Sequence, residues 1–251
     1  MRMRYLAIGN NAKTVKSDNG GEYITAIMYL RPDDEICAMS ATARCQGPCL
    51  NTAGRGIMSN VQLARAIKTA EFKRDPVEFV DVMSEDVKIA LRRARRMGVE
   101  LAVRPNGTSD IPWEHMYGSD GRSLMERFPM VQWYDYTKLA KRKVPDNYHL
   151  TVSYSGANPD YARQVLSIYP KHDRNIAVVF RTKEMVQGLI SGSLRLPPEF
   201  RQFEGAVVDG DRDDLRFMDR KVYGSGRQLL VALYAKGKAK HDRSGFVVDV
   251  A

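Results

Sequence analysis

Three cysteines stand close together near the start of the 251-residue chain, and the chain contains no others. Cys37, Cys45 and Cys49 form a C-x7-C-x3-C pattern. An odd number of thiols in so short a segment suits metal or cluster ligation better than a disulfide framework. A 4Fe-4S cluster on three thiolates keeps one iron open to another ligand, whereas a 3Fe-4S cluster leaves no iron unligated. We therefore expect these three residues to bind an iron-sulfur cluster.

Zinc is the main alternative, because one histidine would complete a Cys₃His site. The chain offers His115, His149, His172 and His241. None of them stands at short zinc-knuckle spacing from the cysteines. A third interpretation is three free thiols without any metal. The spacing favours the cluster over both.

The cysteines follow an expected buried strand. Glu22 to Leu30 is rich in β-branched and aromatic residues and is followed by a proline-containing breaker. Val61 to Phe72 then carries apolar residues at helical spacing. A second helix opens at Asp75-Pro76, is expected to break near Ser84, and ends at Gly98, a residue suited to the left-handed conformation. The cysteine segment is thus predicted to be a loop between a strand and a helix.

Strand and helix patterns alternate over the rest of the chain. The expected strands cover residues 99–104, 131–136, 149–155, 176–181, 206–208 and 229–235. Asn158 and Thr182 are expected to cap helices between them, and residues 195–202, with two prolines, to form a surface loop. This rhythm is typical of a parallel sheet. We predict one α/β domain over residues 1–251, a partial or distorted (β/α) barrel with a cysteine-rich loop after its first strand.

Compact polar clusters follow most of the expected strands. The candidate catalytic residues among them are Asn106, Ser109, Asp110, Asp135, Lys138 and Ser153. The carboxyl ends of the strands converge on one mouth in an α/β barrel, and along one edge in an open doubly wound sheet. We expect the cysteine loop to open at this mouth, with the turn from Asn106 to Asp110 as its nearest neighbour. The alternative is a tight turn whose side chains only satisfy their own backbone.

A run of acids follows the expected strand 206–208. Asp209, Asp211, Asp213 and Asp214 place carboxylates close together, which suits a hard cation such as Mg²⁺. The alternative is a polar turn in which Asp214 pairs with Arg216. We favour the polar turn.

The chain is basic, with 39 Lys and Arg against 30 Asp and Glu and a net charge of +9. This excess raises the prospect of a polyanionic partner such as nucleic acid, although part of it belongs on solvated helix faces. No apolar run approaches the roughly 20 residues that cross a bilayer, so we expect no membrane partner. The basic N-terminus lacks the features of a signal peptide, which favours the cytoplasm. The oligomeric state stays open.

Several runs of the sequence resemble the phage and plasmid gene product 88 family. They are Cys45-x3-Cys49-Leu-x2-Ala53-Gly-Arg-Gly56, Arg104-x-Asn106-Gly-Thr-Ser-Asp110, Tyr134-Asp-Tyr-Thr-Lys138, Asn147-Tyr-His-Leu-Thr151 and Asp209-Gly-Asp211-x2-Asp214-Leu-Arg216-Phe217. The resemblance covers almost the whole chain. It implies a phage origin and a bacterial host cytoplasm, and it assigns no reaction.

A more distant resemblance is to radical S-adenosylmethionine enzymes. These enzymes place a three-cysteine cluster loop after the first strand of a partial (β/α) barrel, and here the cysteine loop also follows an early strand. They typically use C-x3-C-x2-C, whereas the spacings here are seven and three. The resemblance implies an enzyme of radical or Lewis-acid type. The alternative is a nucleic-acid-binding module whose iron-sulfur or zinc site is structural.

Overall fold

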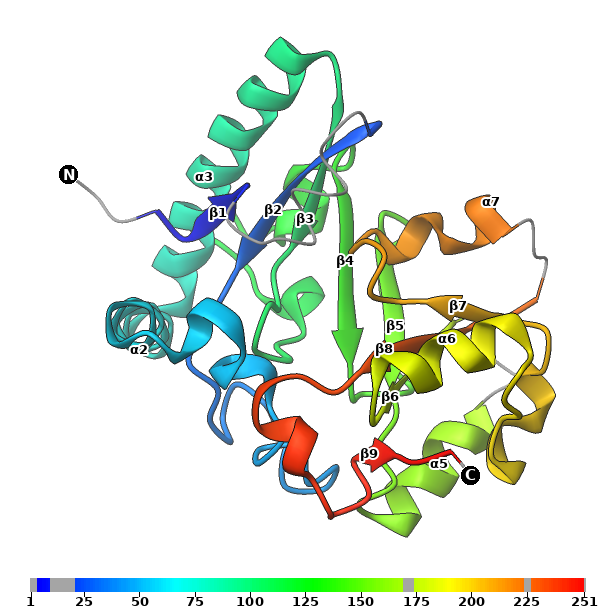
Figure 1. Ribbon diagram of the computed structural model, residues 1–251. Helices are drawn as coiled ribbons and strands as arrows, with labels where there is room; N and C mark the ends of the chain where they lie inside the picture. Colours follow the sequence, from blue (N-terminus) through cyan, green and yellow to red (C-terminus); the bar gives the residue numbers. More distant parts are fainter. Residues whose placement is uncertain (1–3, 10–20, 169–173, 224–226, 251) are drawn as a thin grey trace.

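Figure 1 shows the computed structural model, which describes residues 4–9, 21–168, 174–223 and 227–250. The chain forms a mixed α/β fold around one sheet. The strands are β1 (Leu6–Ile8), β2 (Tyr23–Met28), β3 (Glu100–Arg104), β4 (Gln132–Thr137), β5 (Tyr148–Ser153), β6 (Ile176–Phe180), β7 (Val207–Asp209), β8 (Leu230–Tyr234) and β9 (Val247–Val248).

Within the described residues the sheet has nine strands, in the order β1-β2-β3-β4-β5-β6-β8-β7, with β9 paired to β6. Only β1 runs antiparallel to its neighbour, and the other pairs are parallel. β8 pairs with the full length of β6, while β5 pairs with the first part of its other side and β9 with the last part. The parallel sheet predicted from the sequence is confirmed. Its parallel strands end at a common carboxyl edge.

Helices lie in the connections between consecutive parallel strands, except for the loop over residues 138–147 that joins β4 to β5. The α-helices are α2 (Ser59–Arg74), α3 (Pro76–Met97), α4 (Leu124–Arg127), α5 (Pro159–Ile168), α6 (Lys183–Ser191) and α7 (Asp219–Tyr223). The 3₁₀ helices are η1 (Leu50–Thr52), η2 (Gly54–Ile57), η3 (Trp113–His115), η4 (Pro198–Phe203), η5 (Arg216–Met218) and η6 (Gly237–His241). Among the described helices, none is long and apolar enough to cross a membrane.

α3 illustrates how local sequence sets an element. The Asp75 side chain accepts a hydrogen bond from the backbone N–H of Glu78, and Gly98 ends the helix at a φ of 68°. The break expected near Ser84 was wrong, because α3 is continuous over 22 residues. The Ser84 hydroxyl donates to the Val80 carbonyl one turn earlier, so a buried serine is satisfied inside the helix.

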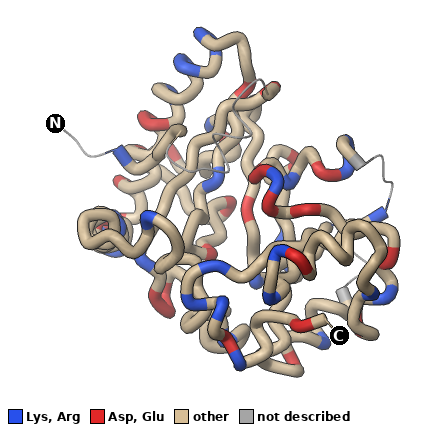
Figure 2. Tube along the Cα trace, viewed as in Figure 1, with Lys and Arg blue, Asp and Glu red and all other residues tan. Residues whose placement is uncertain are grey.

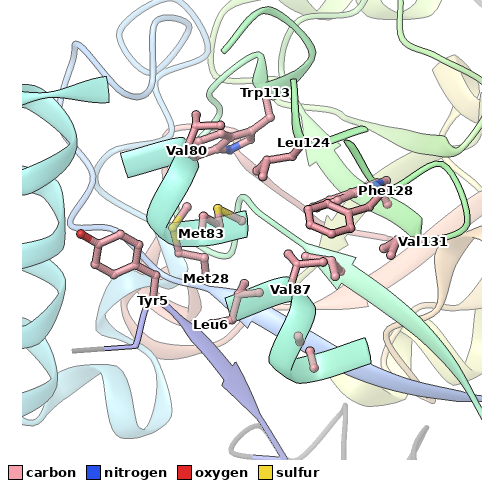
Figure 3. Packing of buried hydrophobic residues seen from close by; sticks show 14 of the residues in the cluster. Tyr5, Leu6, Met28, Val80, Met83, Val87, Trp113, Leu124, Phe128 and Val131 are labelled. Carbon is pink, nitrogen blue, oxygen red and sulfur yellow. The ribbon is translucent and has the colours of Figure 1, made fainter. Parts of the chain in front are cut away.

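Most of the apolar core lies between the sheet and its helices. One cluster joins β1, β2 and β3 to α3, and Figure 3 shows Leu6 and Met28 against Met83 and Val87. A second cluster joins β6 and β8 to α5 and α6. The expected surface loop at residues 195–202 was wrong in part, because Phe200 and other residues of η4 are buried in this second cluster.

The opposite face of the sheet is more polar. Its small apolar clusters pack on side chains such as Tyr134 and Ala102. Arg104 and Tyr136 also lie on this side, where the guanidinium of Arg104 stacks 4.8 Å from the centre of the Tyr136 ring. The segment that follows β7, including η5 and α7, covers this face in Figure 1 and contacts β4 and β5 through η5. The sheet therefore has one apolar face under helices and one polar face under an irregular segment.

Candidate functional site

The segment between β2 and α2, which we call the cysteine loop (residues 29–58), is fixed to the turn that follows β3. The Gly107 N–H donates to the Met28 carbonyl at 2.8 Å, and the Asp110 N–H donates to the Ile36 carbonyl at 2.9 Å. The Thr108 hydroxyl donates to the Leu30 carbonyl at 2.5 Å. A Cβ at position 107 would lie 2.5 Å from a backbone oxygen, so this approach requires glycine. The loop thus starts at the carboxyl edge of the sheet.

The middle of the cysteine loop is held by residues that follow β5. The Ser155 hydroxyl donates to the Ala43 carbonyl at 2.6 Å, and Ser155 is fully buried. The Asn158 amide donates to the Thr42 carbonyl at 2.9 Å. Arg44, which has a φ of 50°, donates to the Ala157 carbonyl at 3.1 Å. The loop therefore spans the edge from β3 to β5.

The end of the cysteine loop lies against η6, which follows β8. Gly237 has a φ of 55°, and a Cβ there would lie 3.2 Å from the Cα of Ala53. Glycine at this position allows the close approach of two backbones. The loop is consequently bounded by the carboxyl ends of β3, β5 and β8.

These anchors bring the three thiols into electrostatic contact. Burial raises the pKa of Cys37 to about 12, and the charges of Cys49, Asp110 and Cys45 add to that effect. Burial also raises the pKa values of Cys45 and Cys49. All three are free cysteines, and the Cys37 sulfur lies 4.0 Å from the Thr108 carbonyl oxygen. Without a metal these thiols stay protonated near neutral pH.

A compact zinc centre is not preformed. A tetrahedral ion with zinc–sulfur bonds of about 2.3 Å needs its sulfurs roughly 3.8 Å apart. In the part of the chain that the structure describes, no three His, Cys, Asp or Glu side chains are grouped closely enough to hold one metal ion. His172, one of the histidines considered as a fourth zinc ligand, lies outside the described residues. The described residues thus form no preformed site for a single metal ion, zinc or any other.

Lys138 lies beside the thiols. Its ammonium group donates to the Ser153 carbonyl at 3.0 Å, the Ser153 hydroxyl at 2.9 Å and the Tyr154 carbonyl at 3.0 Å. Burial lowers the pKa of Lys138 to about 8, while the charges of Cys45, Asp110 and Cys49 oppose this. Its cation in turn acts to lower the pKa values of Cys45 and Cys49. Lys138 and Ser153 form one polar pair next to two cysteines.

Asn106, Ser109 and Asp135 form a second, buried group. Asn106 donates to Asp135 through its backbone N–H and its side-chain amide, at 3.0 and 2.9 Å. Its amide oxygen accepts from the Ser109 hydroxyl and the Trp113 indole N–H. Tyr148 donates to the same carboxylate at 2.6 Å. Burial raises the pKa of Asp135 to about 7. These contacts make the group a brace between strand ends.

Asp110 connects the two groups. Its carboxylate accepts from the Thr137 hydroxyl at 2.8 Å and from the Lys138 N–H at 2.7 Å. Burial raises the pKa of Asp110, although these hydrogen bonds and the Arg142 guanidinium oppose that shift. Its charge acts on Cys37 and Cys45. The structure therefore places Asp110, Lys138 and Ser153 near the thiols.

Arg65 was not singled out from the sequence. Its guanidinium donates to the backbone and side-chain oxygens of Asn51, at 2.8 and 2.6 Å, and its charge acts to lower the pKa of Cys49. One signal was available, because Arg65 falls in the second turn of the helix that follows the cysteine loop. The helical pattern itself assigned this position to an ordinary helix face.

The acids after β7 form ion pairs. Asp211 pairs with Lys236, and Asp213 pairs with Arg216 at 2.8 Å. Asp214 accepts from Arg104 at 3.1 Å, and its charge also acts to raise the pKa of Arg216. These ion pairs agree with the polar turn that the sequence favoured over a cation site. Among the described residues these carboxylates do not gather as a cation site.

Comparisons with known proteins give one match. A family model described as Gene product 88 matches residues 4–250. No curated protein and no solved structure matches the chain. The matched region contains all three cysteines and both polar groups at the carboxyl edge.

Proposed function

The chain belongs to the Gene product 88 family, and we propose that Cys37, Cys45 and Cys49 hold an iron-sulfur cluster at the carboxyl edge of its sheet, as the centre of an enzyme of radical or Lewis-acid type. The observation that carries this proposal is that the only three cysteines of the chain lie in one loop, which is anchored to residues after β3 and β5 and lies against η6 after β8. Active sites of α/β folds lie at the carboxyl ends of the strands.

The donor set fits a cluster. Three half-buried thiols with raised pKa values lose their protons on binding a metal centre, and the neighbouring cations of Lys138 and Arg65 favour the thiolate forms. The cluster would supply electron transfer, or an open iron as a Lewis acid if it is of the 4Fe-4S type. The chain's own residues would orient a ligand: Lys138 and Ser153 offer an ammonium group and a hydroxyl beside Cys45.

The sheet supports the finer fold assignment, a partial (β/α) barrel. From β2 to β6 the spatial order follows the chain order, and all of these strands are parallel. Sequential parallel strands joined by right-handed crossovers are the units from which barrels are built. The cysteine loop follows the first of these parallel strands.

The second candidate function is a nucleic-acid-binding module with a structural cluster. The segment around η6 carries the exposed residues Lys238, Lys240 and Arg243, and Figure 2 shows Lys and Arg gathered along it. This segment contacts η1, which begins directly after Cys49. Exposed cations in a row suit contacts with phosphates.

Metal content tests the cluster. Protein reconstituted with iron and sulfide without oxygen should hold about three to four irons per chain and absorb broadly in the visible range. Replacing any one cysteine by alanine should remove most of the iron. Gln46→Ala is the matched control, because Gln46 lies in the same loop and its amide contacts Asp34 and Ser40. Stoichiometric zinc in protein that does not absorb in the visible range would rule out the iron-sulfur cluster.

Ligand binding separates the two functions. If the protein is an enzyme, S-adenosylmethionine or another small ligand should perturb the absorption spectrum of the protein that holds the cluster. Lys138→Met and Ser153→Ala should weaken this effect. If the protein is a nucleic-acid-binding module, it should be retained on DNA or RNA, and this retention should fall steeply with salt and be unchanged by Lys138→Met and Ser153→Ala. In that case Lys238→Ala and Lys240→Ala should weaken retention, each lowering the salt slope by roughly one.

A further inference from the structure

A set of buried polar atoms gathers on the polar face of the sheet, away from the cysteines. Tyr136 of β4 and Thr151 of β5 are register partners, so their side chains are neighbours on one face. Arg104 stacks on the Tyr136 ring. Arg216 lies in η5, which contacts both β4 and β5, and its charge and the Tyr136 hydroxyl influence each other's pKa. We call Arg104, Tyr136, Thr151 and Arg216 the donor cluster.

The donor cluster contains several atoms with no hydrogen-bond partner among the described residues. They are Arg104 Nε, the Tyr136 and Thr151 hydroxyls, and Arg216 Nε and Nη1. Thr151 is 0% exposed and Arg216 is 1% exposed. Native proteins pair nearly all buried polar atoms, with protein, water or a ligand. Atoms of this kind on one face of a sheet are therefore open to an additional partner, either water or a ligand.

Two of these atoms already take part in ion pairs, and the other ion pairs of the two arginines use different atoms of the same side chains. Arg104 donates to Asp214 through Nη1, and its Nε is 3.8 Å from Asp135 Oδ1. Arg216 donates to Asp213 through Nη2. Its Nη1 lies 3.3 Å from Asp219 Oδ2, an oxygen that also lacks a hydrogen-bond partner in the described structure. Three donor atoms, the Tyr136 and Thr151 hydroxyls and Arg216 Nε, therefore have neither a hydrogen bond nor an ion pair in the described structure.

We propose that the donor cluster binds the oxyanion group, a carboxylate or a phosphate, of a small ligand. The balance of unpaired groups favours an acceptor-rich ligand, because the guanidinium N–H groups only donate and the two hydroxyls are able to donate. Guanidinium groups match the planar arrangement of oxygens in carboxylates and phosphates. The remaining oxygen of Asp219 would accept from an N–H or O–H elsewhere on the same ligand.

The position of the donor cluster connects it to the cysteine loop. Arg104, Tyr136 and Thr151 each stand two residues before an edge residue, namely Asn106, Lys138 and Ser153. Two residues of strand span about 7 Å. A ligand held here would therefore lie roughly one side-chain layer beneath the carboxyl edge. The proposed oxyanion site is separate from the proposed iron-sulfur cluster and does not depend on it.

Binding of inorganic phosphate and of acetate to the cluster-free protein tests the site, and calorimetry supplies the readout. We expect saturable binding of at least one anion, and the tighter of the two identifies the ligand group as phosphate or carboxylate. Tyr136→Phe and Thr151→Val should each weaken that binding by roughly tenfold, because each removes one hydrogen bond to a charged group. Phenylalanine keeps the ring under Arg104, so the stacking is preserved.

These two substitutions also keep the test independent of folding. They delete hydroxyls that have no partner in the described structure, so the melting temperature without ligand should stay the same or rise. Tyr117→Phe is the control, because Tyr117 is 47% exposed and should keep full anion binding. The proposal is overturned if neither anion binds, if both variants bind as the parent does, or if an experimental structure solved in phosphate shows only waters beside Arg216.

Discussion

Asp135 holds Asn106 at two points, accepting hydrogen bonds from its backbone N–H at 3.0 Å and its side-chain amide at 2.9 Å. Asn106 lies two residues after β3, Asp135 lies within the neighbouring strand β4, and the two residues are 29 positions apart. Asn106 is 2% exposed and Asp135 is 0% exposed, so water does not supply substitutes for these bonds. This contact fixes the turn after β3, to which the start of the cysteine loop is hydrogen-bonded.

We predict that Asn106→Ala destabilises the fold by about 3 kcal/mol or more, since several buried groups lose a partner at once. These include Asp135, Ser109 and the Trp113 indole. Urea unfolding followed by circular dichroism measures the change. Asn60→Ala is the control, because Asn60 is exposed near the start of α2 and its loss should cost at most about 0.5 kcal/mol. Equal effects of the two substitutions would contradict the brace.

Acidification should stabilise the protein through Asp135. Burial raises the folded-state pKa of this group from 3.8 to about 7, so the folded state holds its proton more tightly than the unfolded chain does. The associated stability is fully present below about pH 4 and is lost as the pH rises through about 7. At roughly 1.4 kcal/mol per pKa unit, the increment is on the order of 4 kcal/mol.

The measurement compares the parent with Asp135→Asn, which does not titrate. Unfolding free energies between pH 4.5 and pH 7.5 should rise on acidification in the parent relative to the variant. Other carboxyl groups titrate in both proteins and cancel in the difference. Parallel pH profiles would show that Asp135 has an ordinary pKa.

The sequence predicted the elements that depend on near neighbours. α3 begins and ends as expected because Asp75 and Gly98 act on atoms within a few positions of themselves. The expected strands were found because their apolar character is local. Each parallel strand was then paired with its neighbour by the tertiary fold, and β1 and β9 were missed because short segments carry too little pattern.

The partners of charged residues were harder to predict. Asp214 was expected to pair with Arg216, two positions away, and nothing in the sequence indicated its ion pair with Arg104, which is 110 positions away. The spacing of residues along the sequence does not indicate which distant strand will pack against a segment in the folded protein. The same limit applies to the cysteine loop: the cysteine pattern identified the thiols, whereas the Ser155 to Ala43 anchor spans 112 positions.

A buried ion pair near the edge offers a third test. Arg142 donates to Glu114 through Nε at 2.7 Å and through Nη2 at 2.5 Å, and both side chains are almost completely buried. Arg142→Met should cost about 3–5 kcal/mol, because it leaves a buried carboxylate without its partner. Adding Glu114→Gln should restore part of this loss.

Urea unfolding of the parent, the two single variants and the double variant closes the cycle. Lys141→Met serves as the control, because Lys141 is the exposed neighbour of Arg142. Additive effects of the two substitutions would mean that the pair contributes no coupling to the fold.

The last prediction concerns the anchor of the cysteine loop. Ser155→Ala removes the 2.6 Å hydrogen bond to the Ala43 carbonyl, while Ser155 itself is buried and distant in sequence from the loop. We expect the backbone amides of Ala43 and Cys45, which bond only within the loop, to exchange with deuterium several-fold faster. Global stability should fall by about 1–2 kcal/mol, since the bond to the Ala43 carbonyl and the 3.4 Å bond that the Ser155 hydroxyl accepts from the Ala157 N–H are both lost. Iron uptake after reconstitution should also fall in Ser155→Ala, because the thiols lose their fixed spacing.

Ser167→Ala on the exposed side of α5 is the control. Faster exchange confined to β5 and α5, with the loop unchanged, would show that Ser155 does not hold the cysteines in place.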